Sequence, residues 1–378
     1  MTQDIARAPF RITISPEDLD DLRHRLARTR WPLPVPGRGD RPDFRRGMSP
    51  AYLAELAEHW HDGFDWREQE ARLAELPQLT TVVDGQTFHL VHVRSEDPEA
   101  MPLLLLHGWP GSFLEYRTII PLLTEAFHVV IPSPPGFGFS TPLAGTGWEL
   151  ARTADAYAEI MTRLGYRRFL VHGTDMGTGI AGRLAGVHPR RVIGMHLGAD
   201  RAVLGLAGDL FPAPEGLAGP ERRELETQQA ISAAESGYRA MHSHRPDTIG
   251  PSLTDSPIGL LAWIAEKYKT RSGDGFAPPA IDRDLLLSTV SLYWFTRSGA
   301  SSAQFSYEFE HSGLAPVMAA EVPSGWAVFD AHPLVRRVLD PQGAIGHWSE
   351  FARGGHFPAA EVPELLAADL RSFARSIS

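Results

Sequence analysis

The feature of this sequence that most restricts its fold is an alternation of short apolar runs and longer helical patterns that begins near residue 100. The runs PLLLLHG, FHVVIPS, RFLVHG and RVIGMHLG have the length and apolar character of buried strands, and amphipathic segments such as WELARTADAYAEIMTRLGY separate them. Strands that alternate with helices predict a mostly parallel sheet with helices on both faces. We therefore expect an α/β fold.

The strand signal is interrupted between residues 205 and 318 by helical segments with many Pro and Gly residues, and it returns with GWAVFD and AIGHWSEF. A helical insertion between two parts of one sheet predicts a cap over the carboxyl ends of the strands, where ligands bind in open α/β folds. We predict an N-terminal segment packed on the core (1–95), a core in two parts (96–204 and 319–378) and this cap (205–318).

The N-terminal segment carries its own local signals. SPEDLDDLRHRLARTRWP predicts a helix that begins after Ser15 as the N-cap, with Pro16 at the first helical position. Farther along, TTVVDGQTFHLVHVRS has Asp84-Gly85 between two apolar runs, which predicts a β-hairpin.

Composition excludes several functions. The 378 residues have a net charge of -10, which argues against nucleic acid or an anionic membrane surface as a partner. The absence of cysteine excludes disulfides, thiolate metal sites and cysteine nucleophiles. No signal peptide and no apolar run of about 18 residues are visible, so we expect a cytoplasmic protein without a membrane anchor. The abundance of Ala, Arg, Gly and Pro suggests a bacterial host.

The stretch FLVHGTDMGTGIAG, residues 169–182, fits two different sites. Gly177 to Gly182 spell G-x-G-x-x-G, and Asp200 farther on could imitate the acid that binds ribose in a dinucleotide site. In such a site, however, the first glycine follows the strand directly. Here the strand is expected to end near His172, so the glycines fall inside the following helix.

The same stretch also spells G-x-[nucleophile]-x-G around Asp175. A nucleophile on a tight strand-to-helix turn needs small neighbours two residues to either side, and these are Gly173 and Gly177. The following helix would direct its N-terminal dipole and the backbone N–H of Met176 at the site. Taken alone, Asp175 could equally be a helix N-cap.

Two further features favour the nucleophile. The strand LLLL ends in His107-Gly108-Trp109-Pro110, the place where α/β-hydrolases carry their second oxyanion-hole donor, here the backbone N–H of Trp109. After Asp175 come the acid-bearing strand end GWAVFD and then His356, in a Gly-flanked loop before the last helix. Nucleophile, acid and histidine follow one another in this order in α/β-hydrolases.

At these residues the sequence resembles the microsomal-type epoxide hydrolases, which are α/β-hydrolases with a long N-terminal segment and a helical cap. The resemblance runs over nearly the whole chain. It includes PFRITISPEDLDDLRHRLARTRWP and HGWPGSFLEYRTIIPLL, the cap segments SGYRAMHSHRPDTIGPSLTDSPIGLLAWIAEKY and DLLLSTVSLYWFTRSGASSAQFSYE, and EFARGGHFPAAEVPELLAADLRSF. It implies an α/β-hydrolase fold and hydrolysis of an epoxide to a vicinal diol.

The residues suit that chemistry. An aspartate that attacks an alkyl carbon forms an ester, which water activated by His356 can cleave while Trp109 and Met176 bind the oxyanion. A serine at position 175 would form an ether that water could not readily cleave. The resemblance also implies two cap tyrosines as acids for the epoxide oxygen, and the motifs place them at Tyr238 and Tyr307. A phenol of pKa about 10 suits an emerging alkoxide.

The sequence departs from the family pattern in two places. The residue after the nucleophile is commonly Trp, but here it is Met176, which disfavours a haloalkane dehalogenase. The triad acid is expected about three residues after the strand's Phe, and that position holds His332, which cannot stabilise an imidazolium as a carboxylate does. We therefore predict Asp330 as the acid, with Asp200 in reserve.

The expected partners are a small hydrophobic epoxide and water, without a cofactor and without nucleic acid, and a homodimer is compatible with the chain. His242 and His244 form an H-x-H pair, but no carboxylate–histidine pattern accompanies it, so we expect no metal. A haloalkane dehalogenase and a catalytically inactive binding protein on the same scaffold are the alternatives. The sequence leaves both detoxification and natural-product biosynthesis open.

Overall fold

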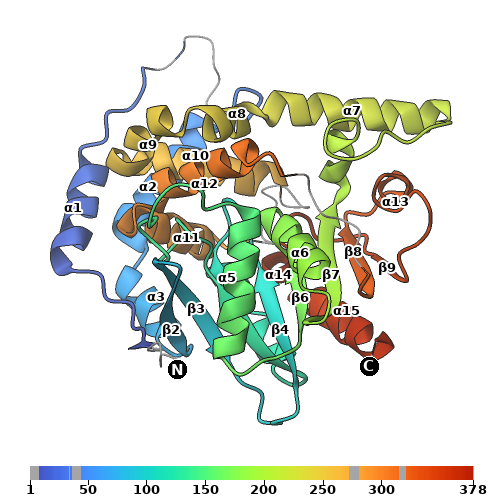
Figure 1. The fold of residues 1–378 in the computed structure, drawn as a ribbon. Coiled ribbons are helices and arrows are strands. Elements are labelled where there is room, and N and C mark those ends of the chain that lie inside the picture. Colours follow the sequence, from blue (N-terminus) through green and yellow to red (C-terminus); the bar gives the residue numbers. More distant parts are fainter. Residues whose placement is uncertain (1–7, 34, 36–43, 272–280, 315–320, 378) are drawn as a thin grey trace.

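In the computed structural model, which describes residues 8–33, 35, 44–271, 281–314 and 321–377, the described strands form one nine-stranded sheet (Figure 1). The strands are β1 (Ala8–Pro9), β2 (Gln78–Val83), β3 (Gln86–Val93), β4 (Met101–Leu106), β5 (Phe127–Pro132), β6 (Phe169–Gly173), β7 (Val192–Asp200), β8 (Ser324–Phe329) and β9 (His347–Glu350). Their order is β1-β2-β3-β5-β4-β6-β7-β8-β9. The pairs β5–β4, β4–β6, β6–β7, β7–β8 and β8–β9 are parallel. The pairs β1–β2, β2–β3 and β3–β5 are antiparallel. This confirms the predicted α/β fold.

The helices follow the predicted alternation. They are α1 (Pro16–Ala27), α2 (Pro50–Glu58), α3 (Trp66–Leu73), α4 (Ile120–Leu123), α5 (Leu150–Arg163), α6 (Met176–Val187), α7 (Gly219–Glu235), α8 (Gly237–His244), α9 (Pro246–Asp255), α10 (Pro257–Arg271), α11 (Arg283–Phe295), α12 (Ser298–His311), α13 (Pro333–Leu339), α14 (Pro358–Glu361) and α15 (Pro363–Ser376). Three short turns join them, η1 (His59–Gly63), η2 (Phe113–Tyr116) and η3 (Arg201–Leu206).

The apolar run of β4 explains why the sheet is covered on both sides. Leu103 and Leu105 are buried in the core under α4 and α15, whereas Leu104 and Leu106 are buried in the core under α5 and α6. Because successive side chains of a strand point to opposite faces, a strand that is apolar at every position needs two covering layers. Figure 1 shows α5 and α6 together on one face and α15 on the other.

The cap comes from the predicted insertion between β7 and β8. Helices α8, α9, α10 and α12 lie over the end of the sheet at which β7 leads into η3 (Figure 1), and α12 contacts both α8 and α9. The N-terminal segment contacts both the sheet and the cap. Its strands β1 to β3 extend the sheet, and its helices α1 and α2 contact α10. The carboxyl ends of the parallel strands therefore face the cap.

The local predictions in the N-terminal segment are confirmed. The Ser15 side chain accepts a hydrogen bond from the Asp18 backbone N–H at the start of α1. Between β2 and β3, Asp84 and Gly85 have φ values of 49° and 78°, as a two-residue hairpin turn requires.

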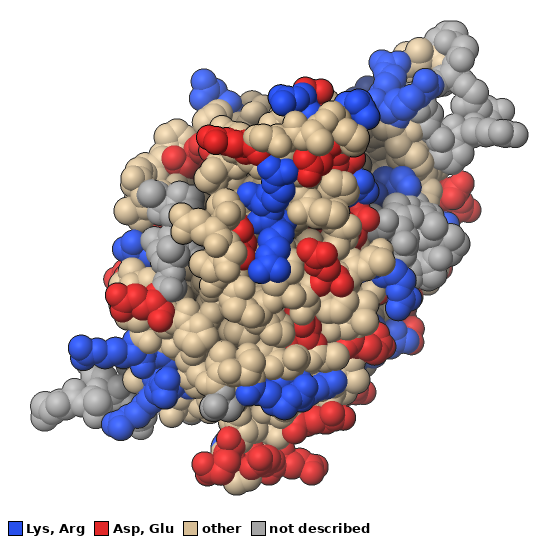
Figure 2. Space-filling model, turned by 90° about the vertical axis from the view of Figure 1, so that its right-hand side faces the viewer, with Lys and Arg blue, Asp and Glu red and all other residues tan. Residues whose placement is uncertain are grey.

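The described surface is charged and mixed. On the face turned toward the viewer in Figure 2, acidic and basic side chains are interspersed with uncharged ones. Among the described helices, none combines the length and the apolar character that a bilayer span would need.

Candidate active site

Asp175 lies on a tight turn between β6 and α6. The strand ends at Gly173 and the helix begins at Met176, so two residues reverse the chain. Asp175 has φ 50° and ψ -128°, a strained combination for a residue with a side chain. The turn is held by the Thr174 N–H, which donates to the Leu106 carbonyl at 3.1 Å. The backbone thus presents Asp175 at the carboxyl end of the sheet.

The glycines around this turn leave no room for a side chain. A Cβ at Gly173 would lie 2.3 Å from the Gly177 carbonyl oxygen, and one at Gly177 would lie 2.4 Å from the Leu106 carbonyl oxygen. Gly177 itself lies inside α6, and the rest of the G-x-G-x-x-G pattern follows within the same helix. These glycines allow close packing of helix on strand, so they are not the turn of a dinucleotide site.

Backbone donors hold the Asp175 carboxylate. The Trp109 N–H donates to Oδ1 at 2.9 Å, and the Met176 N–H also hydrogen-bonds to the carboxylate. Gly108 makes this approach feasible, because a Cβ there would lie 2.1 Å from Oδ1. Burial raises the pKa of Asp175, but contacts with His356, Arg271 and Met176 outweigh it and lower the pKa to about 2. The carboxylate is therefore ionised at neutral pH.

His356 binds the other oxygen of Asp175. Its Nε2 lies 3.2 Å from Asp175 Oδ2, and its Nδ1 lies 3.3 Å from Asp200 Oδ2. Burial lowers the pKa of His356, but hydrogen bonds with the two carboxylates outweigh it and raise the pKa to about 9. The loop before α14 turns at Gly354, whose φ of 87° suits glycine. At rest, His356 is an imidazolium between two carboxylates.

The structure corrects the predicted partner of His356. Asp200, the reserve candidate, contacts the imidazole, and it is largely buried as the last residue of β7. Asp330 follows β8 with a φ of 44°, its side chain is 48% exposed, and its carboxylate lies 4.0 Å from the Arg201 guanidinium. His332 caps α13 by accepting the Leu334 N–H. With this positive φ, the Asp330 side chain is nearly half exposed, and the structure does not bring it to the imidazole.

One of the two predicted tyrosines is at the site. The Tyr238 ring stacks on Trp109, with 4.8 Å between the ring centroids and 16° between the planes. Tyr307 is 38% exposed and stacks on His311. Phe305, two residues earlier in α12, is fully buried. Because two helical residues span about 200°, burial of Phe305 turns Tyr307 outward, so the structure does not bring Tyr307 to Asp175.

Arg271 is also present at the site, and no sequence pattern had indicated it. Its Nη2 donates to the Tyr238 hydroxyl at 2.6 Å, and its Nη1 lies 3.4 Å from His356 Nε2 and 3.7 Å from Asp175 Oδ2. Arg271 is the last residue of α10, a helix that the sequence presents as cap core. A single cation at the end of such a helix is ordinary, so only the fold could reveal its position.

Glu115 is a second group that the sequence did not reveal. It lies in η2, directly after the HGWPGS motif, and it is 5% exposed. Its Oε2 would lie 2.5 Å from a Cβ at Gly111, so the carboxyl group supports the loop that carries Trp109. Burial raises the pKa of Glu115 to about 8, which keeps a neutral carboxylic acid behind the site at neutral pH.

The two histidines of the H-x-H pair lie in different surroundings, and only His242 packs against Tyr238. His242 is buried, accepts a hydrogen bond from Trp263 Nε1 at 2.9 Å and meets the Trp109 ring edge-on. Burial lowers the pKa of His242 to about 4, so it is neutral. His244 contacts the His311 ring.

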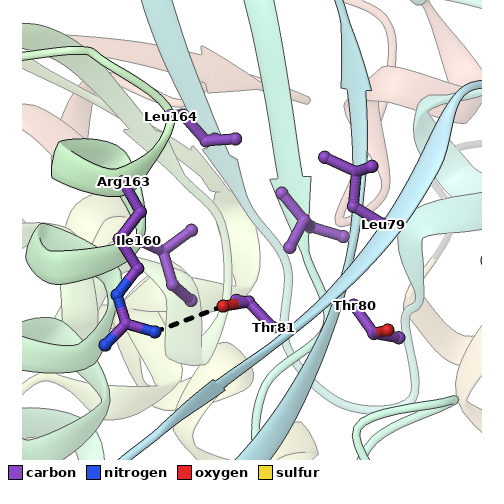
Figure 3. Close-up of a pocket in the computed structure, with 7 residues that line it drawn as sticks. Leu79, Thr80, Thr81, Ile160, Arg163 and Leu164 are labelled. Carbon is purple, nitrogen blue, oxygen red and sulfur yellow. Dashed lines mark hydrogen bonds between the residues drawn. The ribbon is translucent and has the colours of Figure 1, made fainter. Parts of the chain in front are cut away.

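A small hollow lies elsewhere on the molecule. It is found between β2 and α5, where Arg163 donates to the Thr81 hydroxyl at 3.3 Å (Figure 3). None of the residues that line it belongs to the group around Asp175.

Comparison with known proteins agrees with this geometry. Residues 7–116 match the profile of the epoxide hydrolase N terminus, and residues 101–200 match that of the α/β-hydrolase fold. A Stigmatella aurantiaca protein named provisionally as an epoxide hydrolase is 38% identical over 98% of this chain and 85% of its own length. Epoxide hydrolase 1 of Sus scrofa is 34% identical over 98% of this chain and 89% of its own length.

Solved structures give the same result. The epoxide hydrolase of Aspergillus niger superposes with a TM-score of 0.84 at 31% identity and covers 99% of this chain and 97% of its own. The juvenile hormone epoxide hydrolase of Bombyx mori gives a TM-score of 0.86 at 29% identity, with 99% and 95% covered. The chain therefore belongs to the epoxide hydrolase family of the α/β-hydrolases, and it is an enzyme that hydrolyses epoxide ether bonds.

Proposed function

We propose that this epoxide hydrolase converts a hydrophobic epoxide to a vicinal diol through an alkyl ester on Asp175. The observation that carries the proposal is that the two oxygens of this carboxylate have different neighbours. Oδ1 is held by the Trp109 N–H at 2.9 Å, and Oδ2 lies 3.2 Å from His356 Nε2. One oxygen is thus placed to become the ester carbonyl, and the other is placed to attack carbon.

In the first half-reaction, Asp175 Oδ2 attacks an epoxide carbon and the C–O bond breaks. The electron pair moves to the epoxide oxygen, which takes the proton of the Tyr238 hydroxyl. The ester no longer carries the negative charge of Asp175, so His356 loses one of the two anions that raise its pKa. His356 then gives up its proton, which restores the Tyr238 phenol and leaves a neutral imidazole.

In the second half-reaction, the neutral imidazole takes a proton from water and the resulting hydroxide attacks the ester carbonyl. The Trp109 and Met176 N–H groups, which already hold the carboxylate, bind the oxyanion that develops on Oδ1. The ester C–O bond breaks, and the added hydroxyl gives its proton to the leaving alkoxide oxygen, so the diol leaves as a neutral alcohol. Asp175 returns as a carboxylate and His356 as an imidazolium. Asp200, 3.3 Å from Nδ1, orients the ring and stabilises its charged form. Protons and charges balance over the cycle.

The surroundings of the carboxylate suit an apolar substrate. The stacked rings of Trp109 and Tyr238 lie next to Asp175, and His242 closes this aromatic group as a neutral side chain. Such rings bind apolar substituents while the tyrosine hydroxyl remains available to the epoxide oxygen.

Single-turnover hydrolysis in water labelled with ¹⁸O tests the ester route. With enzyme in excess over styrene oxide, the first diol should contain unlabelled oxygen from Asp175, and the label should enter the carboxylate. Later turnovers of the same enzyme should release this label into the diol. Labelled oxygen in the first diol would mean that water attacks the epoxide directly.

A further inference from the structure

Arg271 is the one cation in contact with the proposed nucleophile, acid and base among the residues that the structure describes. Its guanidinium reaches the Tyr238 hydroxyl at 2.6 Å, His356 Nε2 at 3.4 Å and Asp175 Oδ2 at 3.7 Å. Its side chain is 22% exposed. No step from ester formation to diol release has yet required Arg271. Its contact with the Tyr238 hydroxyl nevertheless places it where a group could act on the substrate oxygen.

We propose that Arg271 is the second group that stabilises the epoxide oxygen, in the role that the sequence had given to Tyr307. This inference rests on the proposed ester mechanism and adds to it the identity of one participant. Tyr238 supplies the proton, and Arg271 supplies a fixed positive charge next to it. Tyr307 takes no part, since it stacks on His311 at the surface.

The direction of the short hydrogen bond supports this role. A guanidinium has only donors, so the Tyr238 oxygen must accept in its contact with Arg271. The Tyr238 hydroxyl proton is therefore not used in this bond and is available to the epoxide oxygen. A phenol that accepts from a cation is also a better donor, because the phenolate left after proton transfer is stabilised by that cation.

Charge accounting leads to the same conclusion. At rest, the carboxylates of Asp175 and Asp200 balance the cations His356 and Arg271. Lys267, whose Nζ lies 4.8 Å from the centroid of the Tyr238 ring, is paired with Glu266 and leaves this balance unchanged. Ester formation neutralises Asp175, so a net positive charge remains at the moment when negative charge appears on the epoxide oxygen or on Tyr238. Arg271 is the cation in direct contact with that oxygen of Tyr238. A preorganised charge of this kind lowers the barrier of the alkylation step.

The side chain of Arg271 can be changed without removing its structural contact to the catalytic loop. The His356 backbone N–H donates to the Arg271 carbonyl oxygen at 3.1 Å, and this bond does not depend on the side chain. Arg271→Met keeps a long apolar stem, while Arg271→Lys keeps the charge but loses the planar pair of donors. Tyr307→Phe is the matched control for the other candidate.

The test is pre-steady-state kinetics with styrene oxide, because alkylation and ester hydrolysis can then be measured separately. Stopped-flow tryptophan fluorescence should report ester formation, because Trp109 lies next to Asp175 and contributes to the signal. We expect Arg271→Met to lower the alkylation rate constant by about 10²- to 10³-fold, the usual loss for one oxyanion donor. Arg271→Lys should recover part of this loss, and the hydrolysis rate constant should change far less. Tyr307→Phe should alkylate like the parent.

An Arg271→Met enzyme that alkylates at the parental rate would overturn the inference, as would Tyr307→Phe losing as much as Arg271→Met. Equal losses in both half-reactions would assign Arg271 a merely structural role. If Arg271→Met has a lowered melting temperature, Arg271→Lys and Arg271→Gln decide by the same comparison. Failure of the ester mechanism looks different, because the parent enzyme would then show no ester in a single turnover.

Discussion

Two clusters of histidine and carboxylate lie along the same strand, and they differ in what they can do. The active-site cluster consists of Asp175, Asp200 and His356, and the helix-side cluster consists of His196, His347 and Asp369. β7 contributes to both, with His196 in the middle of the strand and Asp200 at its carboxyl end, about 13 Å apart along an extended chain.

In the helix-side cluster, the carboxylate of Asp369 in α15 is the acceptor of all the hydrogen bonds described below. Its Oδ2 lies 2.9 Å from His196 Nε2, its Oδ1 lies 2.9 Å from His347 Nε2, and Ser349 also donates to Oδ1. The carboxylate is saturated, and the cluster joins β7 and β9 to α15. It therefore holds the fold together.

In the active-site cluster, one histidine contacts both carboxylates. His356 lies between two carboxylates, and Asp175 Oδ2 has His356 and Arg271 as its neighbours. When one anion reacts, the remaining groups change their proton affinity. A histidine–carboxylate contact thus acquires chemistry from its place at the carboxyl ends of the strands and from the strained turn that presents Asp175.

The largest expected effect comes from His356→Asn, compared with His196→Asn. Without a base, the ester on Asp175 should form but hydrolyse on the order of 10⁴-fold more slowly. Intact-protein mass spectrometry should then show one equivalent of styrene oxide bound, and peptide mapping should locate it on Asp175. His196→Asn should show no such adduct if it folds. An adduct-free His356→Asn enzyme with full turnover would place the base elsewhere.

The next effect separates the two candidate acids. Asp200→Asn should lower ester hydrolysis by about 10³-fold, because the imidazolium loses its charged partner. Asp330→Asn should change turnover by less than about threefold, since its side chain is largely in solvent and its ion pair with Arg201 is long. Steady-state turnover of both variants checks this, and the reverse order of effects would restore Asp330 as the acid.

Asp369→Asn should affect stability rather than chemistry. Burial raises the pKa of Asp369, but hydrogen bonds from His196, Ser349 and His347 outweigh it and lower the pKa to about 2. An unfolded Asp titrates near pH 3.9, so the ionised form contributes about 3 kcal/mol to the free energy of unfolding at neutral pH. Because the folded pKa is the lower one, this contribution is present above about pH 4 and is lost as the pH falls toward 2.

Urea unfolding of Asp369→Asn and parent over this pH range measures the contribution. The difference in free energy between the two should be constant near neutrality and should shrink below about pH 4. A difference that does not change with pH would mean that the effect comes from packing alone. Turnover per folded molecule should stay close to that of the parent.

The smallest effect is expected from metal. The ligand atoms of His196, His347 and Asp369 lie within 4.8 Å of one another, a spacing that could hold an ion. The hydrogen bonds to Asp369 already use these atoms, so an ion would have to displace them. Added zinc, or incubation with a chelator, should leave the melting temperature and the turnover unchanged. A rise in melting temperature with zinc that Asp369→Asn abolishes would contradict the structural role.

Local sequence determined much of this protein. The alternation of apolar runs and helices predicted the sheet and the inserted cap, and Gly173, Asp175 and Gly177 predicted the turn, because the steric demands of such a turn involve only neighbouring residues. The flanking loops also predicted Trp109 and His356 as site residues, and the structure brings both to the Asp175 carboxylate.

Only the tertiary structure decided which side chains complete the site. Asp200 ends β7 and Asp330 follows the adjacent strand β8, but only Asp200 meets the imidazole. Tyr307 is turned away because the buried face of α12 is fixed by what packs against it. Arg271 comes to the site from the end of a cap helix. Such contacts join residues far apart in the chain, so their geometry depends on packing that no local pattern records.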